Sequence, residues 1–379
     1  MTSLPSRRRL LTTGAGAALG LGALGAATSP ASAAPARSAA GSGSEETRTL
    51  DELYQDALAE GGKLVVYAGG DLADSGSGAG ARTAFRARFP EMDLQLIVDY
   101  SKYHDVRIDN QFATGTLVPD VVQLQTLQDF TRWKREGRLL HYKPAGFGRL
   151  HKKFRDADGA WISAAVIAFS YVYDIAAAGA DAPRSPLDLI DPRWKGKVAS
   201  SYPHDDDAVL YLYALYAQKY GWDWMAALAA QQPQFARGSF SPGTAINNRT
   251  AVVGLGTGAG ATATSGIRMG MPDGHPFVAW GQRLAIFKQA ASPTAAKLFL
   301  NWQISTERQT SNNWSVRTDI AAPTGLRPVW EYPDANVDGF PRFMEDRAEV
   351  ERLKQTFALY FGEVKGDPTP GWLGLHPGA

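Results

Sequence analysis

A chain of 379 residues is longer than one hydrophobic core usually serves, and it predicts about two domains of roughly 100–200 residues each. Hydrophobic residues make up 44% and charged residues 20%, as in soluble globular proteins, and a formal net charge of +1 argues against nucleic acid or an anionic membrane as the main partner. The sequence contains no cysteine, which excludes disulfides, thiolate chemistry, Cys-ligated metals and a lipid-modified cysteine.

Residues 1–33 have the organisation of an export signal. Arginines at 7–9 precede a weakly hydrophobic, Gly- and Ala-rich stretch at 10–27, and Ala31-Ser32-Ala33 is an A-x-A cleavage site. Residues 6–11 resemble the twin-arginine signal, with an ordinary Sec signal as the alternative. We therefore expect a secreted or extracytoplasmic, soluble protein without a lipid anchor, beginning with a disordered leader at 34–46. After the signal, no apolar run reaches the roughly 20 residues that span a bilayer.

The chain from about residue 47 to 165 alternates helical and strand patterns. Apolar residues at helical spacing predict helices at 50–59, 79–89, 105–114 and 127–136. Short apolar runs predict strands at 63–68, 94–98 and 119–124. This alternation is typical of a parallel α/β sheet flanked by helices.

A second series of elements follows a long β-rich run at 161–173. Residues 188–192 predict a short helical turn stopped before Pro192, and Gly196 predicts a tight turn into a buried strand at 198–200. A helix is expected at about 207–220, strands at 251–255 and 277–287, and an amphipathic helix at 293–305.

Several motifs occur in the order found in one protein family. They are SPLDLIDPRWKGKV at 185–198, PDVV at 119–122, SPTAAKLFLNW at 292–302, STERQ at 305–309 and WSVRTD at 314–319. Over about residues 60–325 the chain resembles the extracellular solute-binding proteins of ABC importers. The similarity is greatest to the ferric-iron-binding-like branch of the type II periplasmic-binding-protein fold.

This resemblance implies an α/β fold of two lobes, each a mostly parallel sheet flanked by helices, joined by hinge strands. Lobe one would comprise residues 47–165 and 285–379, and lobe two residues 166–284. The resemblance further implies a monomer that traps a small polar or anionic solute between its lobes and delivers it to an ABC permease. Ferric members carry two adjacent tyrosines after a strand of lobe two, whereas residues 256–262 here read GTGAGAT. A ferric complex therefore stays open with Tyr202 and His204 as candidate ligands, the metal is unassigned, and no cofactor is expected.

Candidate ligand-binding residues lie beyond the carboxyl ends of the predicted strands, where open α/β sheets bind ligands. Residues 101–104 offer varied polar groups, or are a solvated loop before a helix capped by Asp105. The glycine loop from 256 can cradle an anion with its N–H groups, or is only a close-packed turn. Residues 204–207 resemble a metal cluster, but we favour a helix N-terminus. The candidates at strand ends are Gly70, Asp71, Ser101, Lys102, Tyr103, His104, Gln125, Thr126, Tyr202, His204, Asp205, Gly256, Thr257 and Gly258. Trp280, within the strand predicted at 277–287, is a further candidate because an aromatic ring near the hinge could stack on the ligand.

Motifs of common enzyme classes are missing from the sequence. It has no G-x-S-x-G elbow, no H-E-x-x-H and no P-loop. We therefore expect a binding protein rather than an enzyme. The alternatives are a secreted enzyme on the same fold acting on a small metabolite, and a scavenger or sensor that works without a transporter.

Overall fold

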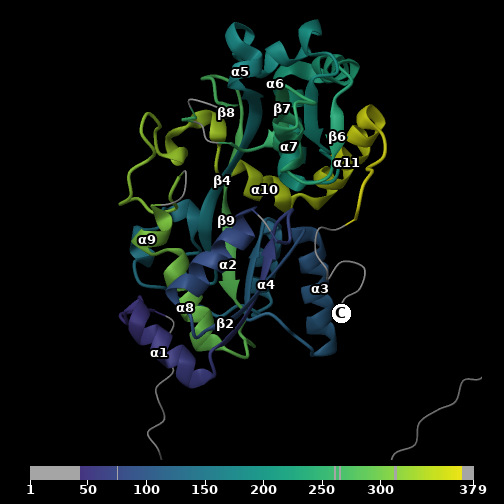
Figure 1. Ribbon diagram of the computed structural model, residues 1–379. Helices are drawn as coiled ribbons and strands as arrows, with labels where there is room; N and C mark the ends of the chain where they lie inside the picture. The colour runs from purple at the N-terminus through teal and green to yellow at the C-terminus, as the bar shows by residue number, and fades with distance from the viewer. Residues whose placement is uncertain (1–42, 75, 260–261, 264–265, 311–313, 369–379) are drawn as a thin grey trace, which may run out of the picture. The chain divides into compact units, whose positions relative to one another are not determined.

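The computed structural model describes residues 43–74, 76–259, 262–263, 266–310 and 314–368 (Figure 1). Its strands are β1 Lys63–Gly69, β2 Asp93–Asp99, β3 Val121–Leu124, β4 Ile162–Asp174, β5 Val198–Ser201, β6 Gln234–Ala236, β7 Val253–Thr257, β8 Ile267–Gly270 and β9 Val278–Ile286. Its α-helices are α1 Leu50–Glu60, α2 Gly76–Arg88, α3 Ser101–Thr114, α4 Leu127–Arg135, α5 Ile175–Ala178, α6 Asp207–Ala230, α7 Ser241–Asn247, α8 Pro293–Gln303, α9 Thr306–Gln309, α10 Gly339–Glu345 and α11 Arg347–Phe361. The predicted export signal lies outside the described residues.

Two parallel groups of strands are joined by two antiparallel ones. Strand β1 pairs in parallel with β2 and β3, and β5 pairs in parallel with β6 and β7. Strand β9 pairs antiparallel with both β3 and β4, and the far end of β4 pairs antiparallel with β7 and β8. Strand β4 thus continues from one group into the other, as Figure 1 shows. The predicted α/β fold with hinge strands is confirmed.

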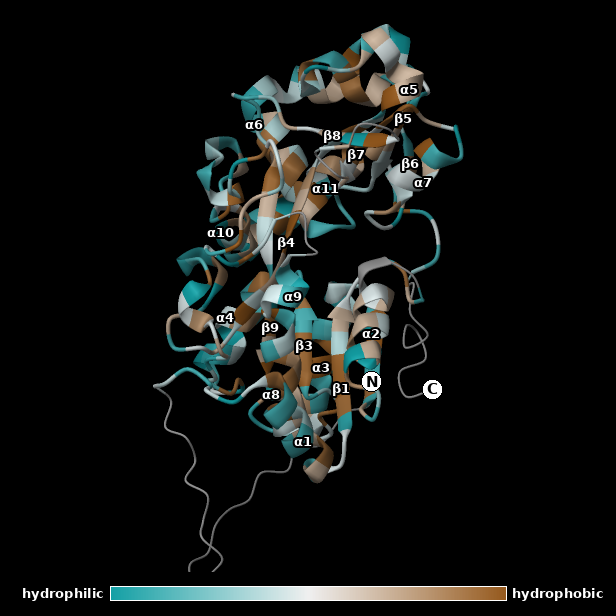
Figure 2. Ribbon diagram, turned by 60° about the vertical axis from the view of Figure 1, so that its left-hand side comes forward, coloured by the Kyte–Doolittle hydropathy of each residue, from teal (hydrophilic) through white to brown (hydrophobic). Residues whose placement is uncertain are grey.

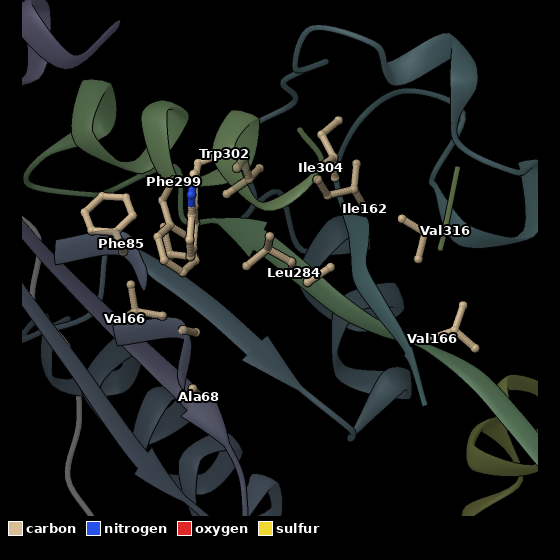
Figure 3. Close-up of a cluster of buried hydrophobic side chains, with 14 of the residues drawn as sticks. Val66, Ala68, Phe85, Ile162, Val166, Leu284, Phe299, Trp302, Ile304 and Val316 are labelled. Carbon is tan, nitrogen blue, oxygen red and sulfur yellow. The ribbon is translucent and has the colours of Figure 1, made fainter. Parts of the chain in front are cut away.

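The core of the first strand group is built where α8 and α2 cover the sheet. Phe85 of α2 contacts both Phe299 and Trp302 of α8, with ring centroids 5.5 and 5.2 Å apart. Figure 3 shows these three rings beside Leu284 of β9, and all four side chains are buried. Strands β1 and β3 are accordingly mostly brown in Figure 2, because strands covered by helices need apolar residues on both faces.

Two element boundaries differ from the prediction in ways that matter for the site. Helix α3 begins at Ser101, with Tyr100 at its N-cap, so residues 101–104 are its first turn and Asp105 is not the cap. Strand β7 continues to Thr257, so Gly256 and Thr257 are strand residues rather than loop residues. Apolar periodicity missed both because the extra residues are polar or small.

Glu45 and Glu46 differ from the prediction of a disordered leader at 34–46, because both make defined contacts. Glu45 accepts hydrogen bonds from the backbone N–H groups of Gly146 and Gly148. Glu46 accepts from Arg48 and from the Tyr142 hydroxyl. The predicted leader therefore does not extend to Glu45 and Glu46.

The C-terminal helices pack with the second strand group. Helices α10 and α11 contact α6, and Phe340, Val350 and Phe357 belong to the same buried cluster as Tyr213 of α6. The sequence placed all of residues 285–379 in lobe one. We propose instead that residues 339–361 go with lobe two, and otherwise keep the predicted lobe boundaries as a proposal.

Asp120, in the PDVV motif, directly precedes β3 and forms hydrogen bonds to β1 and to the start of α8. It is 2% exposed, and its carboxylate accepts hydrogen bonds from the N–H of Val65 in β1 at 2.9 Å and the N–H of Ser292 before α8 at 2.8 Å. A buried carboxylate between two backbone donors satisfies groups that have no access to water.

We therefore expect Asp120→Ala to lower the free energy of unfolding by about 3 kcal/mol, because two buried N–H groups lose their acceptors. Urea denaturation followed by circular dichroism measures the loss. Asp74→Ala is the matched control, since the Asp74 side chain is 93% exposed, and should change stability by less than about 0.5 kcal/mol. Equal effects of the two substitutions would contradict the assigned role.

Candidate functional site

A cavity of about 580 Å³ lies beside the β4–β9 ladder and is lined from both strand groups. Residues Ala164–Ile167, Phe169, Trp280 and Gln282 contribute to its wall from the ladder itself. This volume falls within the range that small-molecule sites usually have. The cavity is therefore the candidate ligand site.

Helix α7 presents one face to the cavity. The residues that line it from this helix and its N-cap are Phe240, Gly243, Thr244 and Asn247, spaced at i, i+3, i+4 and i+7. Gly78 and Ala81 of α2 line it from the other strand group. The same cavity is thus bounded by helices that belong to different halves of the fold.

Three sets of hydrogen bonds between residues of the cavity wall join one strand group to the other. The Lys102 ammonium of α3 contacts Asp205 before α6, at 2.5 Å to the carboxylate and 2.7 Å to the backbone oxygen. The Gln125 amide after β3 donates to Asp206 at 3.0 Å.

The third crossing joins Asp71 after β1 to Ser239 before α7. The Asp71 carboxylate accepts from the Ser239 backbone N–H at 2.6 Å and from its hydroxyl. Each of the three crossings joins residues more than eighty positions apart in sequence. These contacts hold the two strand groups together beside the cavity, and we call the six residues that make them the latch: Asp71, Lys102, Gln125, Asp205, Asp206 and Ser239.

Two acidic residues of the latch, Asp71 and Asp206, have raised pKa values. Removal from water raises the pKa of Asp71, and hydrogen bonds from Ser239 oppose that rise. Removal from water also raises the pKa of Asp206 to about 6, with the nearby Asp71 carboxylate as the second cause. Asp206 caps α6 by accepting from the N–H groups of Ala208 and Val209. The interpretation of residues 204–207 as a helix N-terminus is confirmed.

Most of the candidate residues named from sequence line the cavity. They are Gly70, Asp71, Ser101, Lys102, Gln125, Thr126, Asp205, Thr257, Gly258 and Trp280. The rule that ligands bind at the carboxyl ends of strands predicted all of these except Trp280, which lies within β9. Whether they contact a solute stays a prediction.

His104 and Tyr103 belong to α3 and lie away from the cavity. His104 is fully buried, stacks on Tyr67 at 4.5 Å between ring centroids, and contacts the Ile97 backbone oxygen at 3.2 Å. Burial lowers its pKa. Tyr103 packs beside Tyr100, 6.0 Å between centroids. Because residues 101–104 form a helical turn rather than a loop, only Ser101 and Lys102 face the cavity.

Tyr202, His204 and Gly256 are also absent from the cavity wall. Tyr202 is 5% exposed and stacks on Phe235 at 5.2 Å, and His204 packs edge-on against Tyr202 at 5.4 Å. At Gly256 a Cβ atom would lie 2.6 Å from Val209, so this glycine serves close packing on α6. Gly256 is therefore close-packed, as the alternative to anion binding required, but it lies in β7 and not in a turn.

Polar residues that the sequence did not single out complete the wall. These residues are Gln123 of β3, Gln282 of β9, Gln303 at the end of α8 and Arg308 of α9. Only the alternation of Trp280, Gln282 and Leu284 on one face of β9 marks a polar side chain inside an apolar strand. No group of three or more His, Cys, Asp or Glu that could hold a metal occurs in the part of the chain that the structure describes.

Residues 118–257 match a family model described as bacterial extracellular solute-binding protein. The iron-bound HitA structure from Pseudomonas aeruginosa is 17% identical, with a TM-score of 0.60 over 78% of this chain and 99% of that one. AfuA from Actinobacillus pleuropneumoniae, solved with fructose-6-phosphate, is 17% identical, with a TM-score of 0.61 over 79% and 99%. An ABC-transporter substrate-binding protein from Agrobacterium tumefaciens is 16% identical, with a TM-score of 0.62 over 79% and 94%. No curated protein matches by sequence.

These comparisons confirm the predicted resemblance. The fold is that of the type II periplasmic binding proteins, and the matched segment is that of an extracellular solute-binding domain. Among the described residues, no helix combines the length and apolar character needed to cross a bilayer. The match to a solute-binding domain holds for residues 118–257, and the structural neighbours support the fold of the chain as a whole.

The raised pKa of Asp206 predicts a pH-dependent contribution to stability. Because this pKa is about 6 in the folded protein and 3.8 ordinarily, the contribution is full below pH 4 and is lost as the pH rises through 6. Asp206→Asn keeps an N-cap oxygen but cannot ionise. The unfolding free energy of the native protein minus that of the variant should therefore fall by on the order of 2 kcal/mol between pH 4 and pH 7. Urea titrations at several pH values measure it, and a constant difference would contradict the assignment.

Proposed function

We propose that this protein is an exported solute-binding protein that captures a small polar or anionic solute between two lobes for an ABC importer. The observation that carries the proposal is the cavity itself, lined from both strand groups and crossed by hydrogen bonds between them. A site built from two halves is completed only when they meet, so a solute that contacts both favours the closed form.

The composition of the wall supports a small polar solute. Carboxylates, amides and hydroxyls stand among aromatic side chains such as Trp280 and Phe169. Such a mixture gives apolar contact with a few oriented polar groups, which is the usual composition of a small-molecule site. Structural neighbours include proteins solved with iron and with fructose-6-phosphate, so this fold accepts solutes of different chemistry.

A ferric complex receives less support than an organic solute. Tyr202 and His204, the candidate iron ligands, are packed outside the cavity wall. The glycines and threonine at 256–258 supply no phenolate. Delivery to a membrane permease, monomeric state and twin-arginine export without a lipid anchor complete the proposal, and they follow from the class and from residues 1–33.

A thermal-shift panel tests the capture function. Mature protein is screened against sugars, sugar phosphates, organic acids, amino acids, polyamines, inorganic anions and Fe(III) citrate. At 100 times its dissociation constant, the cognate solute should stabilise the fold by roughly 2.7 kcal/mol. If no solute in the panel raises the melting temperature, the capture function is wrong.

The latch predicts a measurable closing motion. Because the chain has no native cysteine, Asp74→Cys and Asn248→Cys provide unique dye positions on the two sides of the cavity. Solute should raise energy transfer between the dyes, as the two sides approach. Lys102→Met removes one latch contact of about 1 kcal/mol and should lower the closed-to-open ratio about fivefold without solute. The control Lys63→Met, at the exposed start of β1, should leave the ratio unchanged. Energy transfer that ignores both solute and Lys102→Met would contradict hinge closure.

A further inference from the structure

Three glutamines form the part of the cavity wall where the β3–β9 pair meets the end of α8. Gln123 of β3, Gln282 of β9 and Gln303 of α8 all line the cavity, and Gln282 and Gln303 are 4% and 3% exposed. Gln123 lies opposite Leu284 in the ladder, so Gln282, two residues from Leu284, shares its face as a diagonal neighbour. We call Gln123, Gln282, Gln303 and the adjacent Arg308 the amide floor.

The orientation of the Gln282 amide is fixed by an indole. Trp280 Nε1 donates to Gln282 Oε1 at 3.0 Å, and an indole nitrogen can only donate. The amide oxygen must therefore face Trp280, and the Nε2 group carries its two protons elsewhere. None of the described residues accepts a hydrogen bond from Gln282 Nε2.

The orientation of the Gln123 amide follows from two hydrogen bonds, with the Gln303 amide between Arg308 and Gln123. Arg308 Nε, another group that can only donate, lies 3.5 Å from Gln303 Oε1. Gln303 Nε2 then donates to Gln123 Oε1 at 3.3 Å. The Nε2 group of Gln123 is consequently a donor as well, and it too has no acceptor among the described residues.

The acidic residues of the cavity wall are already engaged on its other side. Asp205 pairs with Lys102 and lies 3.6 Å from Arg237, and Asp207 lies 3.2 Å from Lys354. Asp71 and Asp206 hold the latch through Ser239 and Gln125. The Nε2 groups of Gln123 and Gln282 are therefore donors in the cavity wall that have no acceptor among the described residues.

We propose that the amide floor binds an oxyanion of the solute, a carboxylate or a phosphate. This rests on the proposed capture function and names the chemical group that the site selects. Two oriented amide donors beside the positive charge of Arg308 match an oxygen group that only accepts hydrogen bonds. An ammonium group placed there would meet donors only and would leave its own protons without acceptors.

Gln282→Glu and Gln123→Glu test the floor with almost no change of shape. Each glutamate keeps the oxygen that Trp280 or Gln303 needs but replaces the amide NH2 with a second oxygen. The probes are two matched pairs, fructose 6-phosphate against fructose and succinate against succinamide, with spermidine as a cation. We expect calorimetry to detect the charged member of one pair only, which also identifies the oxyanion as phosphate or carboxylate. Each substitution should weaken that binding by at least about tenfold.

Gln95→Glu is the control, because it makes the same charge change on an exposed residue of β2. It should bind within about twofold of the native protein. Circular dichroism checks that the variants fold, and Gln123→Glu carries the test if Gln282→Glu does not.

Two results would overturn the amide floor. One is binding of fructose, succinamide or spermidine as tight as that of the charged probes, which would leave solute capture intact. The other is undiminished oxyanion binding by both glutamate variants. If none of these probes binds, the floor assignment fails, and the broader thermal-shift panel decides separately whether the protein captures a solute at all.

Discussion

The antiparallel ladder between β4 and β9 is the constraint on which the rest of the structure depends. It is the place where two parallel sheets, each stable only with helices on both faces, become one continuous arrangement of strands. The register of this ladder shifts between Ser163 and Ala165, and that of the β4–β7 pair shifts between Ser170 and Tyr171. Such irregularities bend a strand and interrupt its hydrogen bonding. The extra residue is Ala164 of β4 in the first pair and Gly256 of β7 in the second, so both irregularities lie close to the β4 segment that lines the cavity.

The polar groups on the two sides of the cavity differ in kind and in the contacts that they make. Carboxylates of Asp71, Asp205 and Asp206 are occupied by contacts that hold the two strand groups together. The Gln123 and Gln282 side chains each accept a hydrogen bond at the amide oxygen, which leaves their Nε2 groups as donors. If the amide floor binds an oxyanion as proposed, these amide donors would let a site with more acids than bases in its wall select an anion.

The sequence predicted the fold well because the signals that matter are local and periodic. Apolar runs predicted β1, β4 and β9 to within one residue at each end. The block from Ser185 to Val198 correctly predicted where β5, the first parallel strand of the second group, begins. The order of the motifs along the chain predicted the type II fold, which the hydrophobic periodicity of individual segments could not do.

The site was predicted less completely, for physical reasons. The rule about strand ends found Asp71, Gln125 and Asp205, because it depends only on where strands stop. It could not find Gln282 or Gln303, whose role comes from neighbours distant in sequence. It also misplaced His104, because four polar residues after a strand look alike whether they form a loop or the first turn of a helix.

The latch has a consequence for how fast a solute can enter. Contacts at Lys102, Gln125 and Asp71 cross the cavity, so for a solute too large for the remaining entrance their separation would become a step in association. At high solute concentration the observed binding rate would then stop rising and level off at the rate of opening. The strength of three hydrogen-bonded contacts between side chains would in that case set the maximum rate of uptake, independently of how tightly the solute is finally held.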